Sequence, residues 1–229
     1  MDKLPSFRKA LIFAAHPDDD VFGCGGTIID LARNGCSVKC VYLTSGWRGV
    51  HGSLPPAEKA RARRMEAEKA CRVMGSKPLF MDLDRLKKLE FSEENRAAVT
   101  SLLEKEKPDL VMTHCKDDAH QTHRTLASIV ESALERMGPL GPKVVWFYET
   151  WSPVHMPDII HFFGGRTMDT KTKALKQHRS QFDRLDIENA MKGLAMYRGR
   201  MGQEIMGGHG GISEKGLYGE AFLSKKQGK

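Results

Sequence analysis

Short apolar runs alternate with longer amphipathic stretches from the start of the chain to Tyr148. Apolar runs indicate buried strands, and longer stretches with apolar residues three or four apart indicate helices. The predicted strands are Ala10–Ala15, Val38–Leu43, Leu79–Met81, Leu110–Thr113 and Val144–Tyr148. The predicted helices are Gly26–Ala32, Pro56–Met74, Ser92–Glu106 and His123–Met137. This alternation predicts an α/β fold with a parallel sheet covered by helices on both faces.

The pattern loosens after Tyr148. Residues 151–165 indicate loop and a short strand, followed by predicted helices at Met168–His178 and Ile187–Met201. The chain contains no internal repeat and no low-complexity linker, and its 229 residues suit one substantial domain. We therefore expect a single domain spanning residues 1–229.

Composition narrows the class of protein. Hydrophobic residues make up 40% and charged residues 28%, as in ordinary globular chains. No apolar stretch is long enough for a membrane span, and the N-terminus lacks the features of a signal peptide. The cysteines are scattered, without a CxxC pair, so we expect neither disulfides nor a thiolate zinc site, and a cytoplasmic location. They are Cys24, Cys36, Cys40, Cys71 and Cys115.

The formal charge of +7 raises the question of a nucleic-acid partner. Much of the basic charge lies in KARARRMEAEKACR, where it alternates with glutamates as on a solvated helix face. The sequence shows no nucleic-acid recognition signature, so we expect no such partner. An anionic small substrate, or solubility alone, accounts for the charge equally well.

Histidines and aspartates gather where the predicted strands end. HPDDD (residues 16–20) follows the first strand, TSGWRGVHG (44–52) the second, and HCKDDAHQTH (114–123) the fourth. In an open parallel sheet, ligands bind at the carboxyl ends of the strands. These segments are therefore expected on one rim of the sheet.

The residue types on this rim predict a metal site. His16 and Asp19 are three residues apart in a turn that Pro17 restrains, and His120 and His123 would share one face of a helix start. A mixed set of imidazoles and carboxylates is typical of catalytic zinc, although another divalent transition metal also fits. Taken alone, the first motif could be an exposed turn and the second a chance spacing of histidines. The convergence of both motifs on one rim of the sheet favours a metal site.

The glycines of FGCGG offer a rival interpretation, a dinucleotide-binding turn. Gly23, Gly25 and Gly26 do not match GxGxxG in register, and the neighbouring carboxylates would repel a pyrophosphate. We expect them to let the backbone turn closely around the site and begin the first helix.

AHPDDD followed by GCGGTI, together with DxHxxHR at residues 118–124, resembles the LmbE-like, PIG-L family of zinc-dependent de-N-acetylases. RARRMEAEKACRVMG, KALKQHRSQ and YGEAF resemble further segments of that family. The resemblance implies a Rossmann-like three-layer sandwich with a mostly parallel central sheet. It also implies a zinc-dependent hydrolase that removes an acetyl group from an N-acetylglucosamine-type sugar or conjugate.

The same resemblance implies roles for individual residues. His16, Asp19 and His123 would be the zinc ligands. Asp18 would be the general base for the attacking water, and His120 would stabilise the oxyanion or protonate the leaving amine. A substrate-contacting arginine of the family corresponds to Arg63.

Two positions depart from the family pattern. The family's usual HPDDE ends here in Asp20, which is one methylene shorter than glutamate. The family often has HPDH where this chain has His120-Gln121-Thr122-His123, so Thr122 replaces an aspartate. Asp117 or Asp118 could substitute for that missing charge.

Specificity is expected to lie in the rim loops. Trp47, Arg48 and Trp151 would either bind a sugar or pack locally. Two alternative functions remain: a phosphoesterase, for which two metals about 3.5–4 Å apart are common, or a metal- or sugar-binding protein without turnover. A homo-oligomer is also compatible with the sequence.

Overall fold

A seven-stranded sheet forms the centre of the computed structural model, which describes residues 4–85, 87–182, 186–205 and 217–226. The strands run in the order β3-β2-β1-β4-β5-β7-β6. Their bounds are β1 (Lys9–Ala14), β2 (Ser37–Tyr42), β3 (Lys77–Phe80), β4 (Leu110–His114), β5 (Val144–Tyr148), β6 (Ile159–Phe163) and β7 (Tyr218–Lys226). Each of the five strands predicted before Tyr148 overlaps an observed strand.

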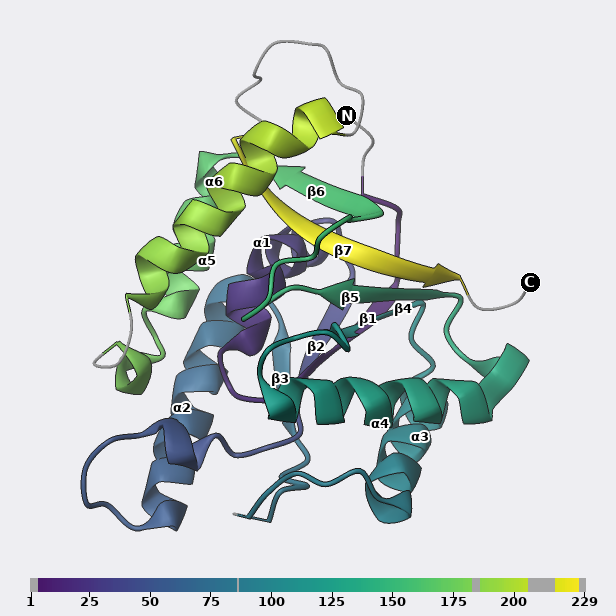
Figure 1. Cartoon of the computed structure of the whole chain (residues 1–229), viewed down its shortest axis with the longest axis vertical. Helices are drawn as coiled ribbons and strands as arrows, with labels where there is room; N and C mark the ends of the chain where they lie inside the picture. Colours follow the sequence, from purple (N-terminus) through teal and green to yellow (C-terminus); the bar gives the residue numbers. More distant parts are fainter. Residues whose placement is uncertain (1–3, 86, 183–185, 206–216, 227–229) are drawn as a thin grey trace.

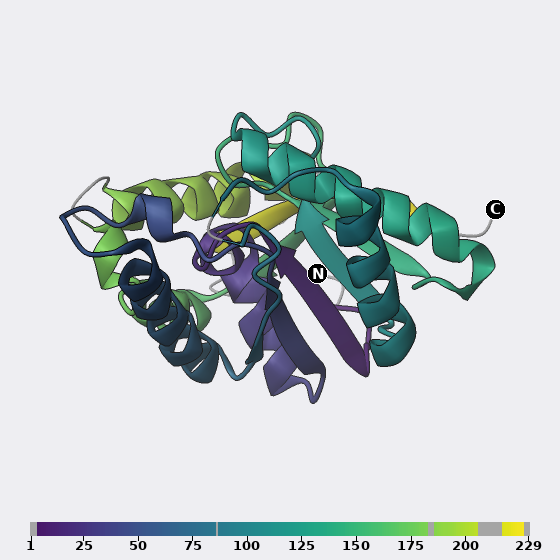
Figure 2. The same cartoon turned by 90° about the horizontal axis from the view of Figure 1, so that it is seen from below.

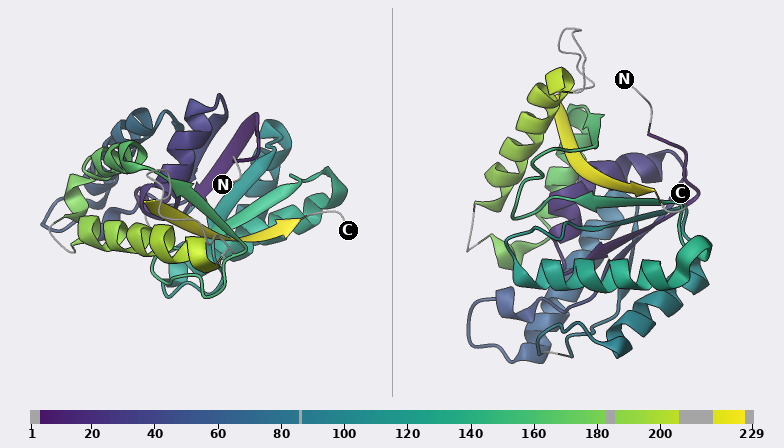
Figure 3. Two further views of the ribbon diagram at one scale, coloured as in Figure 1. Left: turned by 90° about the horizontal axis from the view of Figure 1, so that it is seen from above. Right: turned by 45° about the vertical axis from the view of Figure 1, so that its right-hand side comes forward.

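Strands β1 to β5 pair in parallel, whereas β7 is antiparallel to both β5 and β6. Figure 3 shows β7, in yellow, running beside β5. The YGEAF segment thus lies in a closing strand, and the mostly parallel sheet predicted from the sequence is confirmed.

Helices cover both faces of the sheet, as the alternating pattern predicted. Their bounds are α1 (Asp19–Arg33), α2 (Pro56–Met74), α3 (Glu93–Glu106), α4 (Gln121–Met137), α5 (Gly165–Leu175) and α6 (Ile187–Ile205). Helices α1, α2, α5 and α6 lie on one side, and α3 and α4 on the other (Figures 1 and 2). In the described part of the chain, no helix is both long enough and apolar enough to cross a bilayer.

The alternation of side chains along each strand builds two cores. From β1, Ile12 packs with α1 and α2, while Leu11 and Phe13 pack with α3 and α4. Successive side chains of a strand point to opposite faces, so strands buried on both sides are apolar throughout. This explains why the sequence shows short continuous apolar runs.

The first helix begins earlier than predicted. The sequence placed a turn at HPDDD and a helix only from Gly26, but α1 begins at Asp19. Acidic side chains in a first turn are favoured by the partial positive charge of the helix N-terminus, and Asp19 and Asp20 both lie there. The carboxylates therefore belong to the helix start as well as to the rim.

Two glycines of FGCGG allow close packing inside α1. A Cβ on Gly23 would lie 2.4 Å from the Tyr148 ring, and one on Gly26 would lie 2.6 Å from Phe163. We expected these glycines to let the backbone turn closely around the site and begin the first helix. The backbone does leave helical geometry between them, at Cys24 (φ −144°, ψ 22°), and the two glycines also let the helix approach the sheet closely.

A buried ion pair fastens α1 to the far end of the chain. Glu220 of β7 accepts hydrogen bonds from the Lys171 Nζ (2.6 Å), the Gly26 N–H (2.7 Å), and the Thr27 N–H and hydroxyl (2.7 and 2.6 Å). Lys171 Nζ also donates to the Phe22 carbonyl at 2.8 Å. Lys171 and Glu220 are 1% and 3% exposed, so each buried charge is stabilised by the opposite charge of the other.

The order of the strands determines where a ligand site forms. Strand β1 lies between β2 and β4. The chain adds β2 and β3 on one side of β1 and then crosses to the other side, where it adds β4 and β5. In open α/β sheets the crevice at such a switch point, outside the carboxyl ends of the strands, is where ligands bind. The segments after β1, β2 and β4 meet there, as predicted.

We predict that Lys171→Met lowers the free energy of unfolding by about 3–5 kcal/mol, because it leaves the buried Glu220 carboxylate without a counter-charge. Urea denaturation followed by circular dichroism measures this. Lys173→Met, at an exposed position of the same helix, is the matched control. Equal stability of the two variants would contradict a structural role for this ion pair.

Candidate functional site

Three atoms that could bind a metal converge at the switch point, and we call them the metal triad: His16 Nδ1, Asp19 Oδ2 and His123 Nε2. His16 Nδ1 lies 3.1 Å from Asp19 Oδ2, and His123 Nε2 lies 3.2 Å from His16 Nδ1 and 3.3 Å from Asp19 Oδ2. The three residues predicted as metal ligands therefore present one atom each to a single point.

The spacing of these atoms fits a small tetrahedral cation. Zinc binds imidazole nitrogen and carboxylate oxygen at about 2.0–2.2 Å, which places neighbouring ligands of a tetrahedron about 3.3 Å apart. The three edges of the metal triad are 3.1, 3.2 and 3.3 Å. One nearly equilateral face of a tetrahedron is thus preformed, and the fourth corner is left for water or substrate.

Local structure brings two of the ligands together. The His16 backbone N–H donates to Asp19 Oδ2 at 2.7 Å. This bond links the turn after β1 directly to the first residue of α1. His123 comes from the first turn of α4, which follows β4. Because β1 and β4 are adjacent, the two segments face each other across the switch point.

The charges of the triad depend on one another. Burial opposes ionisation of Asp19, but His123 and His16 hold the pKa of its carboxyl well below its usual value. Burial disfavours the charged form of His123, yet the Asp19 and Asp118 carboxylates raise its pKa to about 9. A metal binds only neutral imidazole, so binding here would displace the His123 proton.

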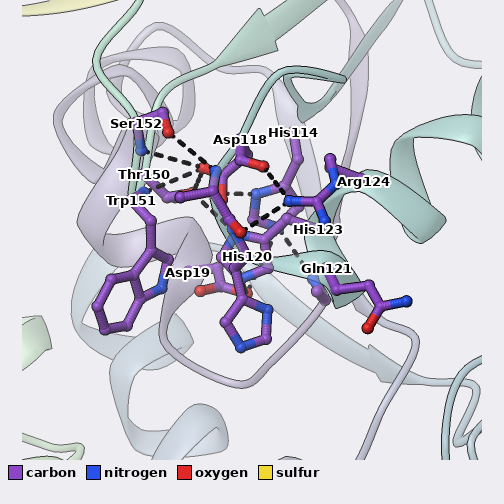
Figure 4. Close-up of polar contacts among 12 residues, drawn as sticks. Asp19, His114, Asp118, His120, Gln121, His123, Arg124, Thr150, Trp151 and Ser152 are labelled. Carbon is purple, nitrogen blue, oxygen red and sulfur yellow. Dashed lines mark hydrogen bonds and ion pairs between the residues drawn. The ribbon is translucent and has the colours of Figure 1, made fainter.

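Asp118 orients the His123 ring from behind. Its Oδ1 lies 3.1 Å from His123 Nδ1, and its Oδ2 accepts hydrogen bonds from the Thr150 hydroxyl (2.7 Å) and the Trp151 N–H (3.1 Å) (Figure 4). A carboxylate on one imidazole nitrogen fixes the proton there and leaves the other nitrogen free for a metal. The arrangement leaves His123 Nε2 as the ligand atom.

Asp118 does not replace the aspartate that is missing at Thr122. It accepts a hydrogen bond from the His120 backbone N–H at 2.8 Å, whereas its side chain contacts the ring of His123. Asp117 is exposed. In the described part of the chain, His120 Nδ1 is buried without a hydrogen-bond partner, so no carboxylate orients that ring.

His114 lies directly beneath the triad. Its Nε2 accepts a hydrogen bond from the Ala15 N–H (3.1 Å) and is 3.4 Å from Asp19 Oδ2, while its Nδ1 lies 3.3 Å from the Thr150 hydroxyl. Burial and the nearby His123 lower its pKa to about 4, so the ring is neutral. His114 therefore packs beside Asp19 at the end of β4, where the Ala15 N–H and Thr150 hold its ring.

Asp18 is held beside the triad by an arginine. Arg63 Nη2 lies 2.9 Å from Asp18 Oδ1, and Arg63 also lies 3.7 Å from Glu66. Glu66 in turn accepts the Ser180 N–H and hydroxyl, both at 2.8 Å. Arg63 is only 1% exposed, so its guanidinium acts on the site by contacting Asp18 and is not itself open to a ligand.

The Asp18 backbone is strained, and burial perturbs its carboxyl. Its φ of 155° and ψ of −24° lie outside the regions open to residues with a Cβ. Such conformations cost on the order of 1–3 kcal/mol and persist where the surroundings hold them. Burial raises the pKa of the Asp18 carboxyl, which Arg63 opposes. A carboxyl with a raised pKa accepts protons more readily than an ordinary aspartate.

His120 lies at the open side of the triad. Its ring centroid is 4.9 Å from that of His16 and 4.5 Å from that of His123, and it stacks on Trp151 at 6.1 Å. Burial, then the neighbouring His16 and His123, lower its pKa to about 4. The neutral ring is therefore available as a hydrogen-bond donor.

Asp20 lies in the first turn of α1 and links that helix to β2. It is fully buried in the first turn of α1, where its Oδ2 accepts a hydrogen bond from the Tyr42 hydroxyl at 2.8 Å. Burial raises its pKa to about 6 despite that bond. The shorter side chain thus reaches β2, and Asp20 anchors the helix that carries Asp19.

Two clefts flank the triad. Trp47 and Arg48 line one of about 60 Å³ together with His16 and Thr122, and the Arg48 guanidinium lies 5.3 Å from the Trp47 ring centroid. A larger cleft of about 480 Å³ opens beside Asp18 and is bounded by Trp151 and α6. Trp47, Arg48 and Trp151 therefore line clefts at the site, whereas Arg63 lines neither of them.

Sequence reasoning missed Thr150, Glu66 and Ser180. Thr150 follows β5, the parallel strand that pairs with β4 on the side away from β1, so the rule that ligands bind at the carboxyl ends of parallel strands could have drawn attention to it. Glu66 and Ser180 belong to α2 and to the turn after α5, and no local pattern marks their meeting.

We predict that Asp118→Ala lowers zinc affinity about 10–100-fold, because His123 loses the carboxylate that fixes its proton. Competition with a chromophoric chelator measures the dissociation constant. Asp117→Ala, at the exposed neighbouring position, is the control and should bind zinc as the wild type does. Unchanged affinity in Asp118→Ala would contradict the assignment of His123 as a ligand.

Comparison with known proteins agrees with this geometry. The model of the PIG-L family, described as GlcNAc-PI de-N-acetylase, matches residues 11–134. A diacetylchitobiose deacetylase from Thermococcus kodakarensis is 27% identical over 220 residues, covering 85% of this chain and 79% of the relative.

Solved structures show the same fold. An N,N'-diacetylchitobiose deacetylase from Pyrococcus horikoshii superposes with a TM-score of 0.78 and 27% identity, covering 96% of this chain and 84% of that one. A 4-carboxy-2-hydroxymuconate hydratase from Pseudomonas putida superposes with a TM-score of 0.80, 22% identity and 95% coverage of both chains. The family match spans β1 to α4 and more than half of the sequence, including every residue of the metal triad, and the chain therefore belongs to the PIG-L family.

Proposed function

We propose that this chain is a zinc-dependent hydrolase that removes the acetyl group from an N-acetylglucosamine-type sugar or conjugate. The observation that carries the proposal is the metal triad with the strained, partly buried Asp18 beside it. Membership of the PIG-L family and the similarity to diacetylchitobiose deacetylases support the reaction and the substrate class.

The donor set favours zinc. Two imidazoles and one carboxylate, with a fourth corner open, are the composition of a catalytic zinc site. His16, Asp19 and His123 would hold the ion, which when bound would supply a Lewis acid for water and for the amide carbonyl. The same ligands also suit other divalent transition metals.

Asp18 is the proposed general base. It lines the large cleft beside Asp19, so a water at the site lies within its reach. Its raised pKa favours taking a proton from that water as the water attacks the amide carbon. Arg63 keeps the carboxylate in place and ionised before the reaction. The proton held on Asp18 can then pass to the departing amine.

His120 is the proposed oxyanion donor. It lies beside His16 and His123 at the mouth of the site and is neutral at physiological pH. A neutral imidazole N–H donates a hydrogen bond to the oxygen that becomes negative, and one such donor is typically worth about 3–4 kcal/mol. With a pKa near 4, His120 carries little proton to deliver, which favours Asp18 for that step.

The substrate sugar has aromatic and cationic side chains within reach. Trp47 and Arg48 project from the short helix η1 (Trp47–Gly49) after β2, and Trp151 follows β5. Aromatic faces and an exposed guanidinium are suited to bind a hydroxylated ring. Arg63 is assigned to positioning Asp18, since its guanidinium is buried behind that residue.

A hydratase is the second candidate. A muconate hydratase superposes well on this chain, and a 4-oxalmesaconate hydratase from the same species is 26% identical over 126 residues. Arg48, Lys87 and Lys88 line the cleft on the His16 side and could bind carboxylates. Loss of absorbance from 4-carboxy-2-hydroxymuconate, without amine release from any N-acetyl sugar, would favour this function.

We predict that Asp18→Asn retains zinc but lowers kcat by about 10²–10⁴-fold, because the side chain can no longer accept a proton. Release of free amine from N-acetylglucosamine and diacetylchitobiose measures turnover, and metal analysis measures zinc. His123→Ala should lose both zinc and turnover. Full activity in Asp18→Asn would rule out the base assignment, and zinc binding without any amine release in the wild type would rule out the deacetylase.

A second prediction concerns Arg63. Arg63→Met removes the positive charge that lowers the pKa of Asp18, so the acidic limb of the pH profile of kcat/KM should move to higher pH. The direction follows because a base works only above its pKa. Arg63→Lys should restore much of the original profile. Arg64→Met, at the neighbouring and more exposed arginine, is the control, and an equal shift in that variant would contradict the assignment.

A further inference from the structure

The cleft beside Asp18 has a wall that the proposed reaction does not use. Its volume is about 480 Å³, within the range of sites that bury a drug-sized ligand. Asp18 and Asp19 lie at one end, next to the metal triad. Away from them the lining is largely apolar and includes Phe22, Trp151, Pro153, Ile187, Ala190 and Leu194.

Helix α6 supplies half of this wall through its periodicity. Ile187, Ala190 and Leu194 are three and four residues apart, so they share one face of the helix. That face borders the cleft, although none of the three side chains is fully buried. An apolar helix face partly open to water, and directed toward a reaction centre, is suited to an apolar ligand.

The wall is fixed to the loop that borders the triad. Arg198 of α6 donates to Glu149 at 3.0 and 2.7 Å, and both residues are almost fully buried. Glu149 also accepts the Val154 N–H at 2.8 Å, which closes the loop that carries Trp151. The helix and the loop therefore hold the cleft open as a preformed site.

The chemistry of the lining selects among substrates. Thr150 and Gln181 are the uncharged polar residues of the lining, but the Thr150 hydroxyl donates to Asp118 and the Gln181 amide donates to the Gly49 carbonyl. A sugar hydroxyl buried against the apolar side chains of the wall would lose the bonds it makes to water. The charged side chains that line the cleft are Asp18, Asp19 and Asp186, all acidic, so a phosphate or carboxylate there would be repelled. An alkyl or aryl group meets neither penalty and gains from leaving water.

We infer that the cleft binds an apolar aglycone, so that the preferred substrate is an alkyl or aryl glycoside of N-acetylglucosamine. This inference rests on the proposed function, which fixes the acyl group as acetyl and leaves the aglycone as the part that can be apolar. The aglycone extends from the sugar past Trp151 and along α6.

The test compares octyl and methyl β-glycosides of N-acetylglucosamine, with amine release as the readout. The wild type should show at least about a tenfold higher kcat/KM for the octyl glycoside, since several methylenes become buried. Ala190→Glu places a charge on the exposed rim of the wall and should abolish that preference. Met196→Glu, at an exposed position of α6 outside the cleft lining, is the control and should keep it.

Binding separates this inference from the proposed function. If neither glycoside is hydrolysed, calorimetric titration still shows whether the octyl glycoside binds at least about tenfold more tightly than the methyl glycoside, and whether Ala190→Glu removes the difference. Equal affinities would overturn the inference even if deacetylation is observed. A preference for N-octanoylglucosamine, or for a sugar phosphate over the octyl glycoside, would also overturn it.

Discussion

One carboxylate oxygen brings the site together. Asp19 Oδ2 lies within 3.4 Å of nitrogens from His16, His114 and His123, and it accepts the His16 backbone N–H as well. These partners come from the turn after β1, from β4 and from α4, so the geometry depends on the adjacency of two parallel strands. The Asp19 carboxylate and the protonated His123 stabilise each other, and a cation bound by the metal triad would take the place of the His123 proton.

The sequence predicts the location of the site because its signals are local. A short apolar run that ends in HPDDD marks the end of a buried strand, and the same holds for the run before His114. Parallel pairing then brings these ends to one rim, whatever the exact bounds of the elements. The fold class and the gathering of residues 16–20 and 114–123 on one rim follow from the apolar pattern and the residue types, whereas the choice of His16, Asp19 and His123 as ligands comes from the resemblance to the family.

The supporting contacts could not be predicted in the same way. Arg63 of α2 pairs with Asp18, and Glu66 of the same helix accepts hydrogen bonds from Ser180. Such partners are set by how helices pack on the sheet, which no spacing in the sequence records. Asp20 shows the same limit, because only the packed structure reveals that the Tyr42 hydroxyl lies within its reach.

The count of zinc ions per chain, together with the protons released on binding, tests the central claim most directly. Titration of the metal-free protein with zinc, in buffers of different ionisation enthalpy, gives both numbers. With His123 protonated up to a pKa of about 9, we expect one zinc per chain and release of at least about one proton near neutral pH. Two ions per chain would point to a two-metal phosphoesterase. Binding without proton release, or no binding, would contradict the metal triad.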